Sequence, residues 1–186
     1  YVTALGVTDD PGGWRANKRN GGVLIDVDSR EIVTSRLSMP HSPRWHRDQL
    51  WLLESGDGSF GRVDLDTGRY DAIVQLPGFT RGLSFIGSLA FIGLSQVRES
   101  ATFSGIPLVE RSQERVCGVW VVNIDVGAIV AFVRFEDAVQ EIFAVEALDG
   151  IRYPDVINDD LGLIGSSYVL SDAALALVPV ELRETE

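Results

Sequence analysis

His41 combines a reactive side chain with surroundings that favour a site. It lies between two prolines in the run Met39-Pro-His-Ser-Pro43. An imidazole titrates near neutral pH, so it can act as a general base or as a metal ligand. The other interpretation is a histidine that bonds a neighbouring backbone group beside the prolines. Both stay open, and His41 is the candidate catalytic residue and the candidate metal ligand.

Arg81 and Glu141 could supply the remaining groups of a site. Arg81, between Thr80 and Gly82, could hold a carboxylate or a phosphate with two hydrogen bonds. An ion pair with an acidic neighbour such as Glu141 is the alternative. Glu141 itself could serve as a base or a ligand, and Gln140 beside it could be a ligand-binding residue.

Two long segments carry further candidates, because long loops on a rigid scaffold concentrate binding residues. In residues 8–20, Trp14 and Arg15 combine an aromatic surface with charge, which suits a small polar ligand or a peptide. A Gly-Gly turn packed by Trp14 is the alternative. In residues 96–116, Arg98 could belong to a lid over a ligand, and a salt-bridged loop that covers the rim is the alternative.

The composition argues against several classes of function. The net charge of −11 disfavours nucleic acid and anionic membrane surfaces as partners, because both require clustered Lys and Arg. Cys117 is the only cysteine, so neither an intrachain disulfide nor a Cys-based zinc site can form. No apolar run reaches the length of about 18 residues that a membrane span needs. We therefore expect an acidic, soluble, cytoplasmic protein, and the sequence assigns it no cofactor.

A repeated segment indicates which elements must position these residues. Three stretches align, and each reads as a strand, a tight turn and a strand. Asp28, Asp66 and Asp125 occupy equivalent places, 38 and 59 residues apart. A period near 40 matches one β-propeller blade, and the longer interval equals a blade plus an insertion of about twenty residues. The stretches are Gly22–Val33, Gly61–Tyr70 and Gly118–Val130.

Asp26, Asp64 and Asn123 form a second equivalent set in these turns. We expect the turn aspartates to accept hydrogen bonds from backbone amides through their carboxylates. Calcium binding is the less favoured interpretation, because no D-x-D-x-D-G loop surrounds them.

The sequence predicts an all-β fold built from β-propeller blades of four antiparallel strands. A pair of short apolar strands precedes each repeated hairpin, and several of these runs are continuous, as expected of strands covered on both faces. A helical turn is expected only at Asp172–Leu177. N-terminal blades are expected to be missing, or copies to assemble, because so few blades cannot close a ring. The chain is a single propeller segment with approximate blades at 1–38 (partial), 39–78, 79–137 (with the insertion 96–116) and 138–186 (partial).

Six runs carry a resemblance to a known family: Pro11–Lys18, Leu37–His46, Leu76–Leu83, Gly93–Ser100, Arg115–Trp120 and Val139–Ala144. They look like the C-terminal half of the bacterial β-propeller family TIGR03032 (DUF4915). The resemblance covers nearly the whole chain, and runs of this length are specific. It implies a propeller whose N-terminal half is missing, and it implies no particular activity.

In a propeller, the segments that lead into the innermost strands meet at one mouth of the central channel. Here these segments are 39–43, 78–82 and 138–141, and the two long loops belong to the same face. We expect this mouth to bind a small molecule, a peptide or a protein partner, with missing blades of the same full-length chain completing the channel. The alternative is a metal-assisted or acid–base enzyme acting there on a small anionic substrate. A purely structural array of blades is the third possibility.

Overall fold

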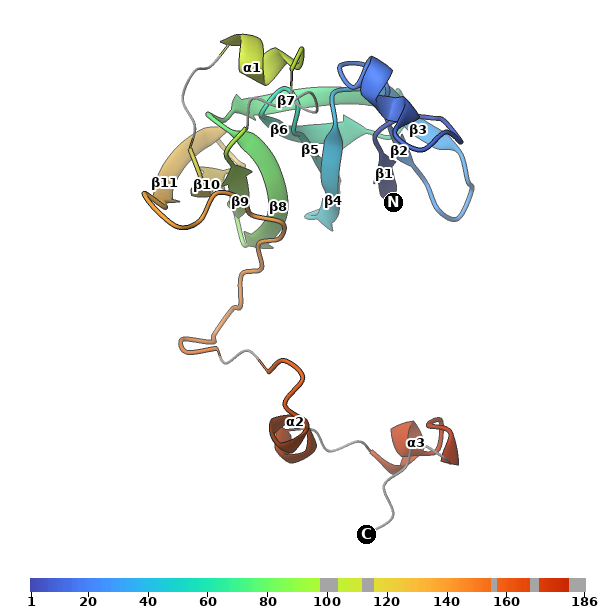
Figure 1. The fold of residues 1–186 in the computed structure, drawn as a ribbon, viewed down its shortest axis with the longest axis vertical. Helices are drawn as coiled ribbons and strands as arrows, with labels where there is room; N and C mark the ends of the chain where they lie inside the picture. The colour runs from blue at the N-terminus through green and yellow to red at the C-terminus, as the bar shows by residue number, and fades with distance from the viewer. Residues whose placement is uncertain (98–103, 112–115, 155–156, 168–170, 181–186) are drawn as a thin grey trace. The chain divides into compact units, whose positions relative to one another are not determined.

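The computed structural model describes residues 1–97, 104–111, 116–154, 157–167 and 171–180 of the chain. The chain falls into two units, Tyr1–Asp149 and Gly150–Glu186. All strands of the described residues lie in the first unit, where they form three antiparallel sheets (Figure 1). The predicted all-β class is thereby confirmed. None of the described helices is long and apolar enough to cross a membrane.

The first sheet has three strands, in the order β1-β2-β3. A 3-10 helix, η1 (Gly13–Asn17), lies in the long connection between β1 and β2. Strands β2 and β3 form the first of the repeated hairpins that the sequence predicts. The bounds of the strands are Val2–Ala4 for β1, Gly22–Ile25 for β2 and Ile32–Leu37 for β3.

Each of the other two sheets is a meander of four strands in which every strand pairs with the next. The second sheet contains β4 (Pro40–His46), β5 (Gln49–Glu54), β6 (Ser59–Asp64) and β7 (Arg69–Gln75). The third contains β8 (Phe79–Ile86), β9 (Leu89–Ser95), β10 (Gly118–Asn123) and β11 (Ala128–Arg134). Helix α1 (Pro107–Arg111) lies in the insertion between β9 and β10. The hairpins therefore recur where the repeat predicts them.

Strand β5 is covered on both faces. Leu50 and Leu52 belong to a buried cluster shared with the first sheet, whereas Trp51 and Leu53 belong to a cluster shared with the third. Successive side chains of a strand point to opposite faces, so four buried apolar residues in a row require neighbours on both sides. The continuous apolar run of β5 therefore belongs to a strand that is covered on both faces, as the sequence predicts.

The repeated hairpins turn through the same hydrogen bonds. Oδ1 of Asp26, Asp64 and Asn123 accepts the backbone N–H two residues later, at 2.8, 3.0 and 2.9 Å. The predicted carboxylate bonds therefore come from the earlier residue of each turn, whereas Asp28 and its equivalents contribute a backbone N–H. The reason is geometric, because a side-chain oxygen closes such a turn only onto amides that follow it.

Residues 140–147 follow β11 without forming a strand, and they lie along the third sheet. The hydroxyl of Ser95 donates to the carbonyl of Ile142 (3.0 Å) and accepts its N–H (2.8 Å). Further along, the N–H of Ala147 donates to Oγ of Ser84 (3.1 Å). The predicted division into blades stays a prediction.

The second unit contains two short helices among its described residues, α2 (Leu161–Ser167) and α3 (Asp172–Leu175). The side chain of Ser171 caps α3 by accepting the N–H of Ala174 at 3.3 Å. This helix coincides with the helical turn that the sequence predicts at Asp172–Leu177.

Candidate functional site

The ring of His41 is held through one of its two nitrogens. Nδ1 lies 3.0 Å from the carbonyl oxygen of Met39 and 2.9 Å from Oγ of Ser55. The hydroxyl of Ser55 in turn donates to the carbonyl oxygen of Thr80 on strand β8. The imidazole also packs edge-to-face with Phe79, with 5.6 Å between the ring centres. Two neighbouring sheets therefore orient one imidazole.

These partners determine which ring nitrogen carries the proton. A carbonyl oxygen can only accept a hydrogen bond, so the bond to Met39 requires a proton on Nδ1 of His41. Because the hydroxyl of Ser55 gives its own proton to Thr80, it also acts as an acceptor toward Nδ1. In the neutral ring the lone pair is then on Nε2. Within the described parts of the chain, no group bonds to Nε2, which leaves it as a base or a hydrogen-bond acceptor.

His41 is uncharged at neutral pH. Burial lowers the pKa of the imidazole below its ordinary value of 6.5, and the hydrogen bond to the carbonyl of Met39 opposes this change. The positive charge of Arg81 lowers the pKa further.

His41 and Arg81 occupy equivalent positions in successive repeats. The following residues, Ser42 and Gly82, both have a positive φ, of 54° and 81°, and both lie where the strand register is interrupted. The N–H of Gly82 donates to Oγ of Ser42 at 3.1 Å, so β4 and β8 touch at this point. The fold therefore brings together two of the residues that the sequence predicts at one site.

Phe143 takes the equivalent position in the next segment. Ser95 holds the place in the third sheet that Ser55 holds in the second, and its hydroxyl likewise donates to a backbone carbonyl of the next segment, that of Ile142. The residue after Ile142 therefore corresponds to Arg81. The guanidinium carbon of Arg81 lies 4.4 Å from the centre of the Phe143 ring, which is a cation–π contact.

We term His41, Arg81 and Phe143 the mouth cluster. Arg81 is half-buried, and within the described ranges no carboxylate forms an ion pair with it. Sequence reasoning missed Phe143 and Ser55. The insertion hides Phe143, because it lies 62 residues after Arg81 instead of 40. A hydroxyl at the end of a buried apolar strand was the available signal for Ser55.

Glu141 and Gln140 lie on an exposed segment just before Phe143. The carbonyl of Gln140 accepts the N–H of Gln96 at 2.9 Å. Burial raises the pKa of Cys117, and the negative charge of Glu141 raises it further. The sequence predicts Glu141 at the same mouth as His41 and Arg81, and the bonds of Ser55 and Ser95 make it the equivalent of Phe79, two residues before Arg81.

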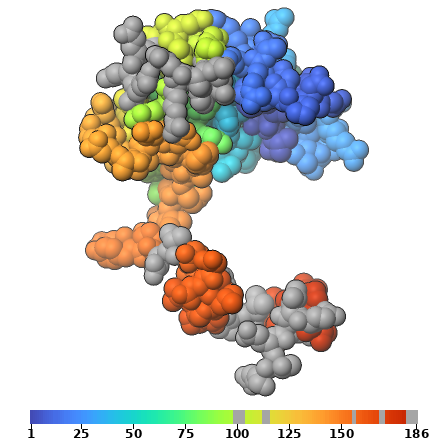
Figure 2. Space-filling model, viewed as in Figure 1, coloured from blue at the N-terminus to red at the C-terminus, as the bar shows by residue number. Residues whose placement is uncertain are grey.

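The two long loops meet over one end of the sheets. Met39 and Phe79, which flank the His41 ring, share a buried cluster with Ile106 and Leu108 of the second loop, and Trp14 of the first loop packs against it. Figure 2 shows the blue residues of the first loop beside the yellow-green residues of α1. We term this arrangement the cap.

Trp14 is partly buried against this buried cluster, and its role in ligand binding stays a prediction. The guanidinium carbon of Arg15 lies 5.1 Å from the Trp14 ring centre, and Arg15 is exposed. Arg98 lies outside the described residues.

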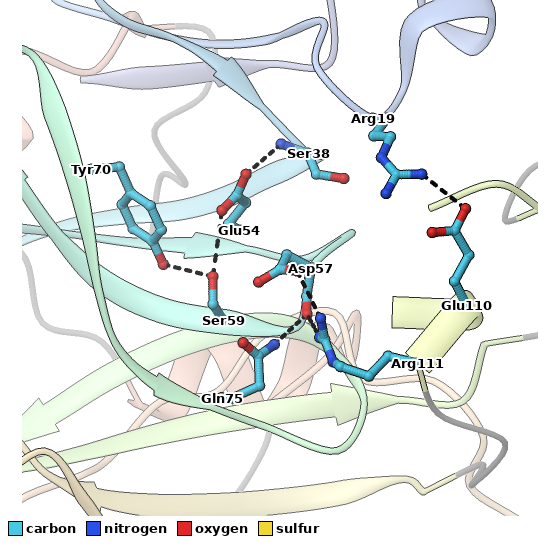
Figure 3. A network of polar contacts seen from close by, with 9 residues as sticks. All are labelled: Arg19, Ser38, Glu54, Asp57, Ser59, Tyr70, Gln75, Glu110 and Arg111. Atoms are coloured by element: carbon cyan, nitrogen blue, oxygen red, sulfur yellow. Dashed lines mark hydrogen bonds and ion pairs between the residues drawn. The ribbon is translucent and has the colours of Figure 1, made fainter. Parts of the chain in front are cut away.

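One ion pair joins the two loops of the cap, and a second joins the cap to the second sheet (Figure 3). Arg19 of the first loop pairs with Glu110 of α1 at 2.8 Å. Arg111 of α1 pairs with Asp57 at 3.0 Å. Asp57 belongs to the turn that begins with Ser55, so α1 and the His41 ring are attached to the same turn.

A partly buried polar network lies next to that turn, because Glu54 directly precedes Ser55 (Figure 3). Glu54 accepts the N–H of Ser38 at 2.8 Å and the hydroxyl of Ser59 at 3.5 Å, and the hydroxyls of Ser59 and Tyr70 lie 3.1 Å apart. Burial raises the pKa of Glu54, and the hydrogen bond from Ser38 opposes this rise. Burial also raises the pKa of Tyr70, which keeps its hydroxyl neutral.

The mouth cluster suits an anion better than a metal ion. The described part of the chain contains no group of three or more His, Cys, Asp and Glu side chains that could hold a metal. In addition, the positive charge of Arg81 would repel a cation bound at Nε2 of His41. The cluster offers a ligand the lone pair on Nε2 of His41 and the guanidinium of Arg81.

A family model described as a domain of unknown function (DUF4915) matches residues 1–157. The match includes all three sheets and the mouth cluster. No curated protein matches the chain.

Proposed function

The chain belongs to the DUF4915 family, and from this premise we propose that its sheets are blades of a β-propeller whose channel mouth binds a small anionic molecule. The proposal includes the finer assignment to the C-terminal half of the TIGR03032 family. The observation that carries the function is Arg81, a half-buried cation that contacts Phe143, lies on the strand next to that of His41 and has no carboxylate partner in the described residues.

The arrangement of the sheets supports the propeller. Each complete sheet is a meander, and successive sheets pack face to face. Strands β4 and β8 and the segment 140–147 follow one another as innermost strands of a propeller would. They are linked by the bonds from Gly82 to Ser42 and from Ala147 to Ser84.

The charge of the mouth cluster supports an anionic ligand. A cation that loses part of its hydration on folding is stabilised by a nearby negative charge. The ring of Phe143 covers one face of the guanidinium of Arg81, and the N–H groups at its edge can hold a carboxylate in its plane. His41 beside it is neutral and does not compete for the anion.

Anion-dependent stability tests this proposal. We expect sodium salts of small carboxylates to raise the Tm of the wild type above its value in sodium chloride of equal ionic strength. A ligand at ten times its Kd stabilises by about 1.4 kcal/mol, which corresponds to about 3–6 °C for a chain of this size. Arg81→Gln should abolish the rise. Arg62→Gln is the matched control, because Arg62 is an exposed arginine on β6.

Two results would contradict this function. A rise in Tm that is the same in Arg81→Gln as in the wild type would reflect a general salt effect. The absence of any rise across carboxylates and phosphate, with both variants folded, would exclude an anion site at the mouth.

The second candidate function is an acid–base enzyme at the same mouth, because Nε2 of His41 carries an unshared lone pair in a neutral ring. Its metal-assisted form would need ligands in addition to His41. An enzyme in which His41 removes a proton next to the carboxylate of a bound anion should exchange that proton with the solvent. In heavy water, deuterium would then enter the anion with the wild type and not with His41→Gln, whereas a binding protein would give none with either.

A further inference from the structure

We propose that the ligand of the mouth cluster is a small 2-hydroxy acid, in which a hydroxyl is next to the carboxylate. This inference rests on the proposed function and narrows it. It is carried by the adjacency of His41 and Arg81, whose strands are joined by the bond from the N–H of Gly82 to Oγ of Ser42.

The first step concerns Nε2. The bonds of Nδ1 to Met39 and Ser55 leave Nε2 as an acceptor without a partner among the described residues. When a ligand displaces water from the mouth, an unmatched acceptor disfavours binding, so the ligand must bring a hydrogen-bond donor. A simple carboxylate such as acetate has none.

The second step concerns the charge of the ligand. The guanidinium of Arg81 can only donate hydrogen bonds, so its partner on the ligand must be an acceptor, and a carboxylate matches its geometry best. The donor for His41 cannot be an ammonium group without placing a second positive charge beside Arg81. A neutral hydroxyl meets both conditions.

The third step concerns the size of the ligand. His41 and Arg81 belong to adjacent innermost strands, and the strands touch through the bond from Gly82 to Ser42. The two polar groups of the ligand must therefore be close together. The rings of Phe79 and Phe143 lie against His41 and Arg81, which favours a compact molecule.

Three small carboxylates separate the contribution of the ligand's hydroxyl to affinity from that of its carboxylate. Glycolate has the carboxylate and the hydroxyl, acetate lacks the hydroxyl, and methoxyacetate keeps the oxygen but cannot donate. We expect glycolate to bind the wild type about tenfold more tightly than acetate or methoxyacetate, as one hydrogen bond to the ring would give. Because all three comparisons use the wild type, they do not depend on the folding of a variant.

Nuclear magnetic resonance of the imidazole C–H groups is a suitable readout. The chain has two histidines, and His46→Gln assigns the signal of His41 by elimination. Glycolate should shift the His41 signal in the wild type and in Arg62→Gln, and it should not bind Arg81→Gln. In His41→Ala, glycolate and acetate should bind equally.

The outcomes distinguish the two proposals. Equal affinity of the wild type for the three probes, with binding lost in Arg81→Gln, would overturn the hydroxy acid and leave the anion site in place. Binding of none of the probes, or binding that does not depend on Arg81, would overturn both.

Discussion

The two nitrogens of the His41 ring have separate roles. Nδ1 bonds Met39 and Ser55, which hold the ring, whereas Nε2 has no hydrogen-bond partner among the described residues. The two interpretations that the sequence left open are therefore compatible, because a backbone bond at one nitrogen prepares the other as a base or acceptor. Ser55 is the positioning residue of this arrangement, since it bonds both the ring and the neighbouring strand.

The neutral state of His41 predicts how stability depends on pH. Its pKa is lower in the folded protein than in the unfolded chain, so the unfolded chain takes up the proton first as the pH falls. The free energy of unfolding should therefore fall as the pH decreases from about 6.5 to the folded pKa, by at most about 1.4 kcal/mol per pH unit. Urea unfolding of the wild type between pH 8 and pH 5 measures this contribution.

His41→Gln is the reference for that measurement, because glutamine does not titrate. The difference in unfolding free energy between wild type and variant should decrease with falling pH. Glu54 acts in the opposite direction, since its raised pKa lowers stability as the pH rises above about 4.5. This contribution is present in both proteins and cancels in the difference. A difference that grows as the pH falls would show that the folded ring favours the charged form.

At the scale of the elements, the three repeated hairpins have the same turn geometry but different residues at the last position of the turn. Arg30, Gly68 and Gly127 are equivalent, with φ of 63°, 68° and 64°, and each donates its N–H to the carbonyl four residues earlier. A left-handed conformation is strained for arginine and not for glycine. The first hairpin therefore carries a strain that the other two avoid.

Arg30→Gly should stabilise the protein. Relief of the left-handed strain is worth about 1–2 kcal/mol, and the greater freedom of glycine in the unfolded chain offsets about 0.5–1 kcal/mol of it. The expected net gain is about 0.5 kcal/mol in the free energy of unfolding, measured by urea denaturation. The reverse change in an equivalent turn, Gly127→Ala, should destabilise by about 1 kcal/mol. A loss of stability in Arg30→Gly would show that the side chain of Arg30 stabilises the folded protein by more than the left-handed strain destabilises it.

At the scale of the whole first unit, apolar surface is left uncovered on strand β11 of the third sheet and on strand β4 of the second. Strand β11 is exposed along its whole length, and Phe132 on it is 62% exposed. On strand β4 of the second sheet, Trp45 is 56% exposed, although its equivalent in the next repeat, Phe85, packs against Trp51 and His46. In the propeller proposed above, neighbouring blades would cover such surfaces.

Residues 1–186 alone should therefore self-associate or bind a hydrophobic dye. Phe132→Ser should reduce both, because it removes apolar area from the outer face of the third sheet. Val126→Ser is the control, since Val126 is equally exposed but lies in a turn. Light scattering coupled to size exclusion measures the association. A monomer that melts cooperatively and binds no dye would count against the propeller.

The sequence by itself determined the repeated hairpins, the antiparallel all-β class and the strand covered on both faces. These features depend on local turn chemistry and on the alternation of side chains along a strand, which a single chain displays directly. It also singled out His41 and Arg81, because both lie in segments that lead into predicted innermost strands.

Only the tertiary structure decided which residue joins them. The insertion of the third sheet breaks the spacing, and the hydrogen bonds of Ser55 and Ser95 show that Phe143, two residues beyond Glu141, takes the equivalent position. The state of the His41 ring was likewise undetermined, because it depends on a carbonyl fixed by the fold and on a hydroxyl from another strand. Registers and partners of this kind are set by packing between sheets, which sequence spacing does not report.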